Sequence, residues 1–357
     1  MKRGMLMPKK REAVWILWFI MGSVAVAGDF YVSSSVGDDS FPGSEQQPFR
    51  TIQRAMTEVD GAGGTVHLMP NEIFREKINI RSGGTETHPL IIEGNGAVVH
   101  LGRNVSNGPW TKIGEEYRLE QEVPPHQRHY TTSPLFIDGL PVWAEHPKGL
   151  GKPAWHGGSL RYDEAGKMVV RFPKGLSPEN SSIVLVGRDL DPVVHGSGGK
   201  HVIIRDLTVA FAGNDGFNFH NRCIGFKLVR VRALFNGDQG ISSHGESEVV
   251  VELSEVAFNG SQSAGVVDIN NARTGYRDLL NHQNRNAGFL LKGSRHRLEA
   301  VVSFGNPGGD LPEETDSVVL VDCSAGVEKL PKHFPEWGSP EDLSNRMARF
   351  EELMPVD

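Results

Sequence analysis

The sequence predicts an all-β protein, a right-handed parallel β-helix solenoid in which short strands stack coil upon coil. Two observations support this fold class. The 357-residue chain contains 42 glycines and only 38% hydrophobic residues, as expected for many short strands joined by many turns. After His201, four similar segments follow one another at nearly equal spacing. Such internal repetition is typical of a solenoid.

The N-terminus predicts a signal peptide at residues 1–27. Five basic residues between Lys2 and Arg11 precede the apolar run AVWILWFIM, and the sequence Ala25-Val26-Ala27 matches a cleavage site. The apolar run is too short to span a bilayer as a helix. We therefore expect a secreted or periplasmic protein that is not associated with a membrane after cleavage and is a monomer.

The charge of the mature chain argues against nucleic acid as a partner. Cleavage removes five positive charges and one negative charge from a chain of formal net charge −7, which leaves −11. Cys223 and Cys323 are the only cysteines. In the register proposed below they lie about four coils apart, at roughly 4.8 Å per coil, beyond disulfide reach. We expect both to be buried free thiols.

Residues 28–104 are predicted to form the first coils and a capping helix. The segment Phe49–Val59 has one apolar helical face, which we expect to plug the open end of the solenoid and cover its first strand edge. That face consists of Ile52, Ala55, Met56 and Val59. Short apolar strands are predicted at Thr65–Leu68, Lys77–Ile80 and Leu90–Glu93.

Three stretches of this region carry a family resemblance: FYVSSSVGDDSFPGSEQQPFRTIQRAM, GGTVHLMP and NEIFREKINIRSGGTETHPLIIEGNGAVV. They resemble the N-terminal region of right-handed β-helix proteins of the pectate-lyase-like superfamily. The resemblance implies the same fold. It also implies a carbohydrate-active protein whose partner is a polysaccharide or oligosaccharide.

Residues 105–195 interrupt the rhythm of the coils and are rich in proline. The segments PLFIDGLPVWAEHP and GGSLRYDEAGKMVVRFPKG predict hairpins, so we expect a β-rich insertion packed on the solenoid. Trp143 or Trp155 of this insertion is expected to form one side of a sugar-binding groove by stacking on a sugar ring. The coils resume over residues 196–325. Residues 326–357 are expected to lie over the last coil as a cap, with a helix whose apolar face comprises Leu343, Met347, Phe350 and Leu353.

The repeats AFAGNDGFNFHN, LFNGDQGISSHGE, AFNGSQSAGVVDINN and HQNRNAGFLLKGS align on Gly216, Gly240, Gly265 and Gly288. The glycines are 24, 25 and 23 residues apart, a period that fits one β-helix coil. Three asparagines recur just before the glycines and are expected to stack as an internal hydrogen-bonded ladder. These are Asn236, Asn259 and Asn284.

Alternation along each strand predicts which side chains after the glycines face outward. The first positions, Phe217, Ile241, Val266 and Phe289, should face inward. His220, His244 and Lys292 should share one outward column. In the third repeat, whose turn is two residues longer, we expect a slip of one residue. The slip would turn Val267 and Ile269 inward and Asp268 and Asn270 outward, because the other register would bury Asp268 without an obvious partner.

Carboxylates beside this column suggest chemistry. Asp215 and Asp238 precede the glycines of adjacent coils, so their carboxylates should lie roughly 5–8 Å apart, within the range found in glycoside hydrolysis. The stretch NGDQGISSHG loosely resembles the aspartate-containing strands of polygalacturonase-like glycosidases. Those enzymes carry adjacent aspartates, whereas Gln239 stands in the second place here, so the resemblance does not carry over an Asp–Asp pair.

Three functions remain open on the sequence alone. In a glycoside hydrolase, Asp238 would be the general acid or nucleophile, with Asp215 or Asp268 as its partner, while His220, His244, Asn218, Asn270 and Trp143 bind sugar. In a polysaccharide lyase, Lys292 or His244 would be the base, and Arg222 or Arg295 would neutralise a uronate carboxylate. The third function is a non-catalytic glycan-binding or structural β-helix. We expect no cofactor, with a Ca²⁺ ion held by Asp215, Asp238 and neighbouring carbonyls as an open alternative.

Overall fold

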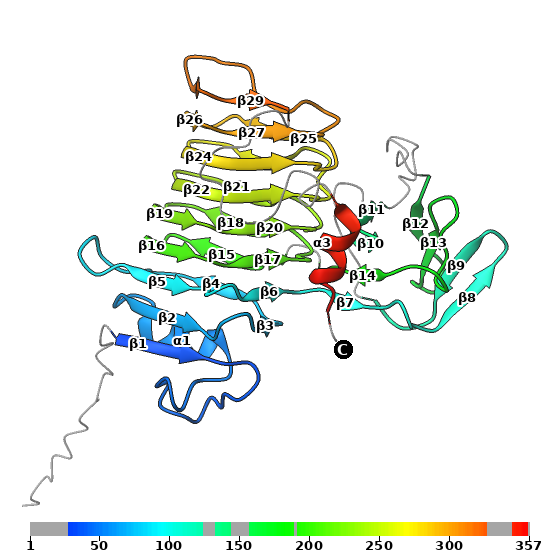
Figure 1. Ribbon diagram of the computed structural model, residues 1–357, viewed down its shortest axis with the longest axis horizontal. Helices are drawn as coiled ribbons and strands as arrows, with labels where there is room; N and C mark the ends of the chain where they lie inside the picture. The colour runs from blue at the N-terminus through cyan, green and yellow to red at the C-terminus, as the bar shows by residue number, and fades with distance from the viewer. Residues whose placement is uncertain (1–27, 124–132, 144–156, 189–190, 327–344, 356–357) are drawn as a thin grey trace, which may run out of the picture.

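The computed structural model of the chain is a parallel β-solenoid (Figure 1). It describes residues 28–123, 133–143, 157–188, 191–326 and 345–355. Strands of successive coils pair in parallel, so that the chain climbs from β1 at one end of the solenoid to β29 at the other. The predicted all-β parallel β-helix is thus confirmed.

Two parallel sheets form the wall of the solenoid. The larger has 15 strands: β1 (Gly28–Val32), β2 (Gly64–Leu68), β3 (Ile73–Phe74), β5 (Leu90–Glu93), β6 (Val98–His100), β16 (Lys200–Arg205), β17 (Thr208–Ala210), β19 (Ile224–Val229), β20 (Arg232–Leu234), β22 (Glu248–Ala257), β24 (Arg273–His282), β26 (Arg295–Glu299), β27 (Val302–Phe304), β28 (Val318–Val321) and β29 (Ser324–Ala325). The smaller has six strands: β4 (Ile78–Ile80), β15 (Val194–Ser197), β18 (Phe217–His220), β21 (Ile241–Ser243), β23 (Ala264–Asp268) and β25 (Ala287–Leu291).

The coils turn at corners where the backbone is left-handed. In the coil that contains β18, the three corner residues are Asn221 (φ 65°), Arg230 (φ 52°) and Phe235 (φ 53°). Only glycine adopts this conformation without a steric cost. The corners are therefore held by the stacking of each coil on the next rather than by local preference.

The four aligned glycines lie in one column, as predicted, immediately before the register partners Phe217, Ile241, Val266 and Phe289. The reason for glycine is space. A Cβ at Gly265 would lie 2.5 Å from Asn284 Nδ2, and one at Gly240 would lie 2.8 Å from Asn259 Nδ2. The asparagine ladder next to this column thus requires residues without a side chain.

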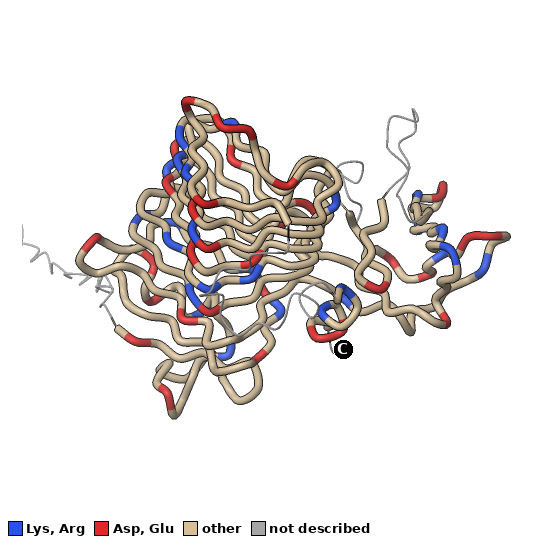
Figure 2. Tube along the Cα trace, turned by 45° about the horizontal axis from the view of Figure 1, so that its top comes forward, with Lys and Arg blue, Asp and Glu red and all other residues tan. Residues whose placement is uncertain are grey.

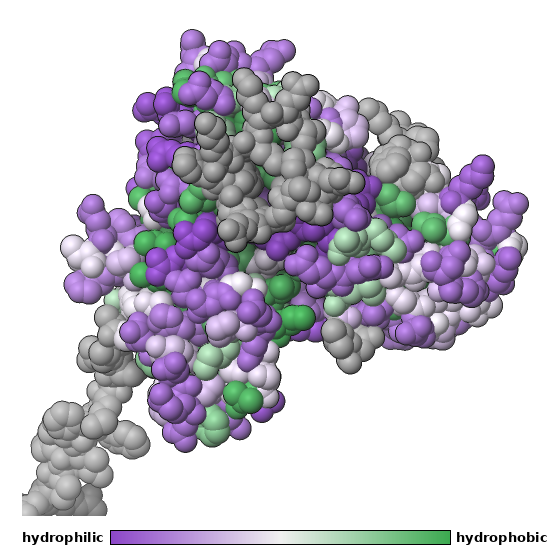
Figure 3. Space-filling model, viewed as in Figure 1, coloured by the Kyte–Doolittle hydropathy of each residue, from purple (hydrophilic) through white to green (hydrophobic). Residues whose placement is uncertain are grey.

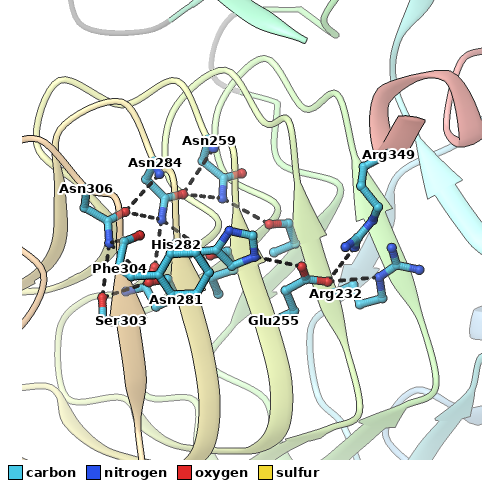
Figure 4. A network of polar contacts seen from close by, with 12 residues as sticks. Arg232, Glu255, Asn259, Asn281, His282, Asn284, Ser303, Phe304, Asn306 and Arg349 are labelled. Atoms are coloured by element: carbon cyan, nitrogen blue, oxygen red, sulfur yellow. Dashed lines mark hydrogen bonds and ion pairs between the residues drawn. The ribbon is translucent and has the colours of Figure 1, made fainter. Parts of the chain in front are cut away.

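The ladder itself is confirmed and is one residue longer than predicted (Figure 4). Asn236 Nδ2 donates to Asn259 Oδ1 at 2.9 Å, and Asn259 Nδ2 donates to Asn284 Oδ1 at the same distance. Asn284 Nδ2 then donates to Asn306 Oδ1 at 3.1 Å. All four side chains are buried, so each amide–amide bond satisfies polar atoms that no water reaches.

The N-terminal helix α1 (Ile52–Val59) lies at the first-coil end of the solenoid (Figure 1). Its predicted apolar face is buried in the main core, where it packs against β1, β2 and β4. Thr51 caps the helix by accepting a hydrogen bond from the backbone N–H of Arg54.

The chain between β6 and β15 forms two further, antiparallel sheets, which lie beside the solenoid (Figure 1). One contains β7 (Arg103–Asn104), β10 (Leu135–Ile137), β11 (Leu140–Val142) and β14 (Ile183–Leu185). The other contains β8 (Trp110–Ile113), β9 (Glu116–Leu119), β12 (Ser159–Tyr162) and β13 (Met168–Arg171). The pairs β10–β11 and β12–β13 are the two predicted hairpins. The exact limits of the insertion, residues 105 and 195, stay a prediction.

The C-terminal helix α3 (Arg346–Glu352) is not where we expected it. It lies against the side of the middle coils and not over the last coil (Figure 1). Phe350 meets Phe211 and Phe235 edge-on, at centroid distances of 5.7 and 5.3 Å. Met347 is exposed, and Leu343 lies outside the described residues. A stack of corner phenylalanines, unrecognised in the sequence, gives the helix an apolar docking surface on the outside of the solenoid.

The outside of the coils is polar and charged. Acidic and basic residues follow each other along one edge of the solenoid, where they pair between coils, as Lys227 does with Glu252 at 2.8 Å (Figure 2). Hydrophobic residues on the face seen in Figure 3 occur in small, separate groups. No helix among the described residues is long and apolar enough to cross a bilayer.

Both cysteines are free, as predicted. Cys223 is buried, but Cys323 is only partly buried, which corrects our expectation for the second thiol. Burial raises the pKa of both thiols. Neither is thereby activated as a nucleophile.

Candidate functional site

The outward face of the six-stranded sheet brings together three of the predicted site residues, Asn218, His220 and His244. The first column that points away from the core contains the register partners Asn79, His195, Asn218 and Ser242, on four adjacent strands, of which Asn218 and Ser242 are buried. The second begins with Ser197, His220 and His244. We call these seven side chains the histidine face. They lie on strands that stack about 4.8 Å apart, so the face follows the long axis of the solenoid.

The imidazoles of this face contact one another. The rings of His220 and His244 are stacked, with centroids 4.3 Å apart and planes 4° from parallel. His195 meets His220 edge-on at 5.9 Å. Ser242 Oγ lies 2.6 Å from His244 Nε2, which fixes the orientation of that ring. Burial, together with the positive charges of Lys77 and His220, lowers the pKa of His195 and favours its neutral form.

The predicted slip at the third repeat is wrong. Val266 pairs with Ile241, and Asp268 pairs with Ser243, so the register is the same as in the other coils. Asp268 therefore faces inward and is fully buried, and it is not part of an outward site. Val267 and Ile269 occupy the outward columns instead. Asn270 is a left-handed corner residue (φ 62°) whose Oδ1 accepts from Gly245 N, so it does not join the histidine column.

Asp268 has the partners that the sequence argument failed to find. Thr274 Oγ1 and Tyr276 Oη each donate to its Oδ2 at 2.8 Å. His296 Nδ1 lies 2.7 Å from Thr274 Oγ1, and its Nε2 accepts from the backbone N–H of Gly293. Burial raises the pKa of Asp268 to about 6, and the two hydroxyl donors lower it only in part. The result is a polar cluster within the solenoid core.

Asp215 and Asp238 lie on adjacent coils, but not at equivalent positions. Asp238 N donates to Asn214 O, and Gly216 N donates to Gln239 O, so Asp215 is level with Gln239. Asp215 is 1% exposed. Its Oδ1 accepts from Gln239 N at 3.1 Å, and its Oδ2 accepts from the amide groups of Asn218 and Asn214. The predicted substrate ligand Asn218 is thus also a support for Asp215.

Asp238 is bound by Gln239, the residue that replaces the second aspartate of the glycosidase pattern. Gln239 Nε2 donates to Asp238 Oδ1 and to Ser261 Oγ, the latter at 2.9 Å. Arg285 lies near enough for the Asp238 charge to favour its protonated form. The guanidinium of Arg285 rests against the ring of Trp143. Trp143 therefore does lie near the carboxylates, whereas Trp155 falls outside the described residues.

The predicted basic residues are more dispersed than expected. Lys292 is exposed and continues the second column beyond Ile269, so it is two coils from His244. Arg222 is 72% exposed and forms an ion pair with Glu246 at 3.1 Å. Arg295 begins β26 in the larger sheet and pairs in register with Arg273. Neither arginine belongs to the histidine face.

No group of three or more His, Cys, Asp or Glu side chains in the described part of the chain is arranged to hold a metal ion. A Ca²⁺ ion at Asp215 and Asp238 therefore stays a prediction. The residues that sequence reasoning missed are His195 and Ser242. His195 belongs to a coil that precedes the recognised repeats, while Ser242 sits in the outward position two residues after Gly240, where alternation could have identified it.

Comparison with known proteins gives similarities at low sequence identity. No protein-family model matches the chain. The uncharacterized protein YwoF of Bacillus subtilis (strain 168) is 28% identical over 131 residues, which are 35% of this chain. The chain spans only about a quarter of the length of that curated relative.

Solved structures with a similar fold include three that are 10–12% identical to this chain. The complex of XylC with xylose has a TM-score of 0.46, over 83% of this chain and 68% of that one, at 12% identity. Pectate lyase Pel9A has a TM-score of 0.44, over 86% and 78%, also at 12% identity. A glycoside hydrolase has a TM-score of 0.38, over 84% and 96%, at 10% identity. At these values the similarities assign no activity to this chain.

Proposed function

We propose that the protein is a secreted or periplasmic glycan-degrading enzyme that binds an extended polysaccharide along the histidine face and cleaves it by β-elimination. The observation that carries this proposal is the stacked pair His220–His244, with Ser242 2.6 Å from the second ring. Stacked imidazoles on adjacent coils place bases and hydrogen-bonding groups at the spacing of a chain that runs along the solenoid axis.

The carboxylates favour elimination over hydrolysis. Glycoside hydrolysis needs one carboxyl group that donates a proton and a second that acts as base or nucleophile. Asp215 is 1% exposed and both of its oxygens accept hydrogen bonds, so neither oxygen is open to a substrate as base or nucleophile. Asp268 is excluded from the outer face because it is buried in the core. The paired-carboxylate mechanism thus loses its partner for Asp238.

In the proposed reaction, the imidazole of His244 removes the proton from the carbon next to a uronate carboxylate. The electron pair of that C–H bond forms a carbon–carbon double bond as the bond from the neighbouring carbon to the glycosidic oxygen breaks. The leaving oxygen takes a proton from water, and the protonated His244 neutralises the hydroxide that remains. The ammonium of Lys292, roughly 10 Å along the same column, is too distant for that carboxylate and binds the carboxylate of a neighbouring uronate unit.

The test is to incubate the mature chain with neutral and uronate polysaccharides and to record both new reducing ends and the absorbance of unsaturated uronate. We expect both signals on a uronate polymer. His244→Ala should lower the rate by about 10²–10⁴-fold, while the control His88→Ala, at an exposed histidine of another coil, should not. Full activity of His244→Ala would remove the histidine face from consideration. The absence of both signals on a broad panel would point to a non-catalytic, glycan-binding role.

Hydrolysis is the second candidate, because Asp215 and Asp238 do precede the glycines of adjacent coils. It predicts new reducing ends without the absorbance of an unsaturated product. Asp238→Asn distinguishes the two reactions, since it should abolish hydrolysis but only weaken elimination. The monomeric state remains part of the proposal, to be measured by light scattering.

A further inference from the structure

A cavity of about 300 Å³ lies where the solenoid, the β10–β11 hairpin and helix α3 meet. The hairpin contributes Pro141, the coil corners contribute Gln283, Arg285 and Pro307, and α3 contributes Arg346. Two arginines from separate parts of the chain therefore line one small space. Its volume is at the lower end for small-molecule sites, about that of one or two sugar units.

Arg285 is built into the wall of this cavity. The side chain is 7% exposed, and its Nη1 donates to Gly260 O at 3.0 Å. One face of the guanidinium lies against Trp143, which limits its movement. Its Nε is buried and has no hydrogen-bond partner. A rigid, buried guanidinium with an unused donor is the group that binds a planar oxyanion.

Arg346 brings a second positive charge to the same space. Its guanidinium lies over the ring of Phe258, 5.4 Å from the centroid. Burial lowers the pKa of Arg285 to about 7, against the opposing effect of Asp238, and lowers the pKa of Arg346 to about 10. Both pKa values are lowered, which means that burial destabilises the positive charge of each arginine. A bound anion would restore the lost stabilisation.

The cavity also offers a group for a neutral hydroxyl. Gln283 Oε1 is buried, accepts no hydrogen bond, and belongs to the cavity lining. Pro141, Phe258 and Pro307 supply apolar wall. The lining therefore complements a ligand that has an anionic group, a hydroxyl and an apolar face. A charged sugar has all three.

We propose that this cavity binds the oxyanion of an acidic sugar unit, a carboxylate or a sulfate, between Arg285 and Arg346. The proposal rests on the proposed function in that the sugar belongs to the same glycan. It makes the protein selective for acidic over neutral chains, and it adds a site outside the histidine face.

The experiment is calorimetric titration of the full mature chain with D-galacturonate, D-galactose 6-sulfate and D-galactose. We expect both anions to bind at least roughly tenfold more tightly than galactose, and the tighter of the two identifies the oxyanion. Arg285→Gln and Arg346→Gln should each weaken anion binding by about tenfold or more. Arg285→Lys keeps the charge but not the planar donor pair, so it should restore binding in part.

Two controls separate this site from the other proposal. Arg222→Gln, at an exposed arginine paired with Glu246, should bind the anions as the natural chain does. His244→Ala should also retain anion binding, even though it loses cleavage. Thermal melts of the arginine variants establish that they are folded. Anion binding that survives both Arg285→Gln and Arg346→Gln, or that is lost in His244→Ala, would overturn the cavity site without touching the cleavage proposal. So would failure of the natural chain to prefer either anion.

Discussion

Glu255 on β22 and Arg349 on α3 form an ion pair of 2.7 Å that is buried from solvent (Figure 4). The other Glu255 oxygen lies 3.0 Å from His282 Nε2, and Arg232 Nε approaches Oε2 at 3.2 Å. Burial alone would raise the pKa of Glu255, but the two arginines and His282 together lower it well below its usual range. One carboxylate thus anchors the C-terminal helix to the middle of the solenoid.

Arg349→Ala should lower the free energy of unfolding by about 3 kcal/mol at pH 7, because it leaves a buried carboxylate short of a partner. The measurement is chemical denaturation followed by circular dichroism. Arg297→Ala, which breaks an exposed pair with Glu299, is the matched control and should cost less than about 1 kcal/mol. An equally small effect at Arg349 would mean that α3 is held by the apolar packing of Phe350 and Leu353.

The same network predicts an acid sensitivity. The folded pKa of Glu255 is below that of the unfolded chain, so its contribution to stability is present above about pH 4.5 and is lost as the pH falls through the folded value. Glu255→Gln should therefore be less stable than the natural chain at pH 7, and the difference should shrink in acid. A difference that is independent of pH would contradict the charge argument.

Asp268 should have the opposite dependence. Its folded pKa of about 6 is above the ordinary value of 3.8. The contribution of protonated Asp268 to the free energy of unfolding is therefore fully present below about pH 4 and is lost as the pH rises through 6. The loss amounts to about 3 kcal/mol. Asp268→Asn should remove it, and denaturation at pH 4 and pH 8 measures the change. Asp322→Asn, at an exposed aspartate, should leave the profile unaltered.

The asparagine ladder gives a prediction about packing. Asn259→Ala removes hydrogen bonds to Asn236 and Asn284 at once and should cost about 2 kcal/mol or more. Gly265→Ala should be destabilising for a different reason, since its Cβ would overlap the Asn284 amide. Thermal melts check both, against Asn107→Ala at an exposed position. A neutral Asn259→Ala would show that the ladder follows the fold and does not stabilise it.

Asp215 is expected to act by holding Asn218 and the backbone of Gln239 in place. Asp215→Ala should lower glycan cleavage, mainly by raising KM, and Asp215→Asn should recover part of the loss because the amide oxygen still accepts one hydrogen bond. If Asp215→Asn instead abolishes turnover as fully as His244→Ala, the carboxylate itself takes part in the reaction. Steady-state kinetics of the three variants distinguish these results.

The repeat and the inward columns could be predicted because coils that stack must have nearly equal length and must alternate their side chains. The register at Asp268 could not be predicted by the same logic. Its partners Thr274 and Tyr276 lie on β24, around the next corner of the coil, and His296 is one coil further on. Whether a buried carboxylate is satisfied depends on such contacts between strands of different sheets. These contacts cannot be inferred from the alternation of side chains within the strand that carries Asp268.

The place of the C-terminal helix had a signal that was not recognised. Phe235 and Phe258 directly precede the ladder residues Asn236 and Asn259, Phe211 occupies the equivalent place in the preceding coil, and all three are left-handed corner residues. Such a corner turns the side chain outward, which an argument from strand alternation does not consider. The helix covers this outward stack. Arg346 was missed for the same reason, since the cavity that it lines exists only once the helix and the hairpin are in place.

The attachment of α3 to the middle coils also determines how the molecule would respond to a pulling force. Tension applied at the C-terminus reaches the solenoid first through Arg349 and Phe350, at β22 and the corner phenylalanines. The coils that carry β26 to β29 lie beyond that anchorage, in the segment between the anchor and the helix. These coils bear no force while α3 stays bound. The detachment of α3 is therefore the first step of unfolding under tension, and only afterwards are the last coils of the solenoid pulled apart.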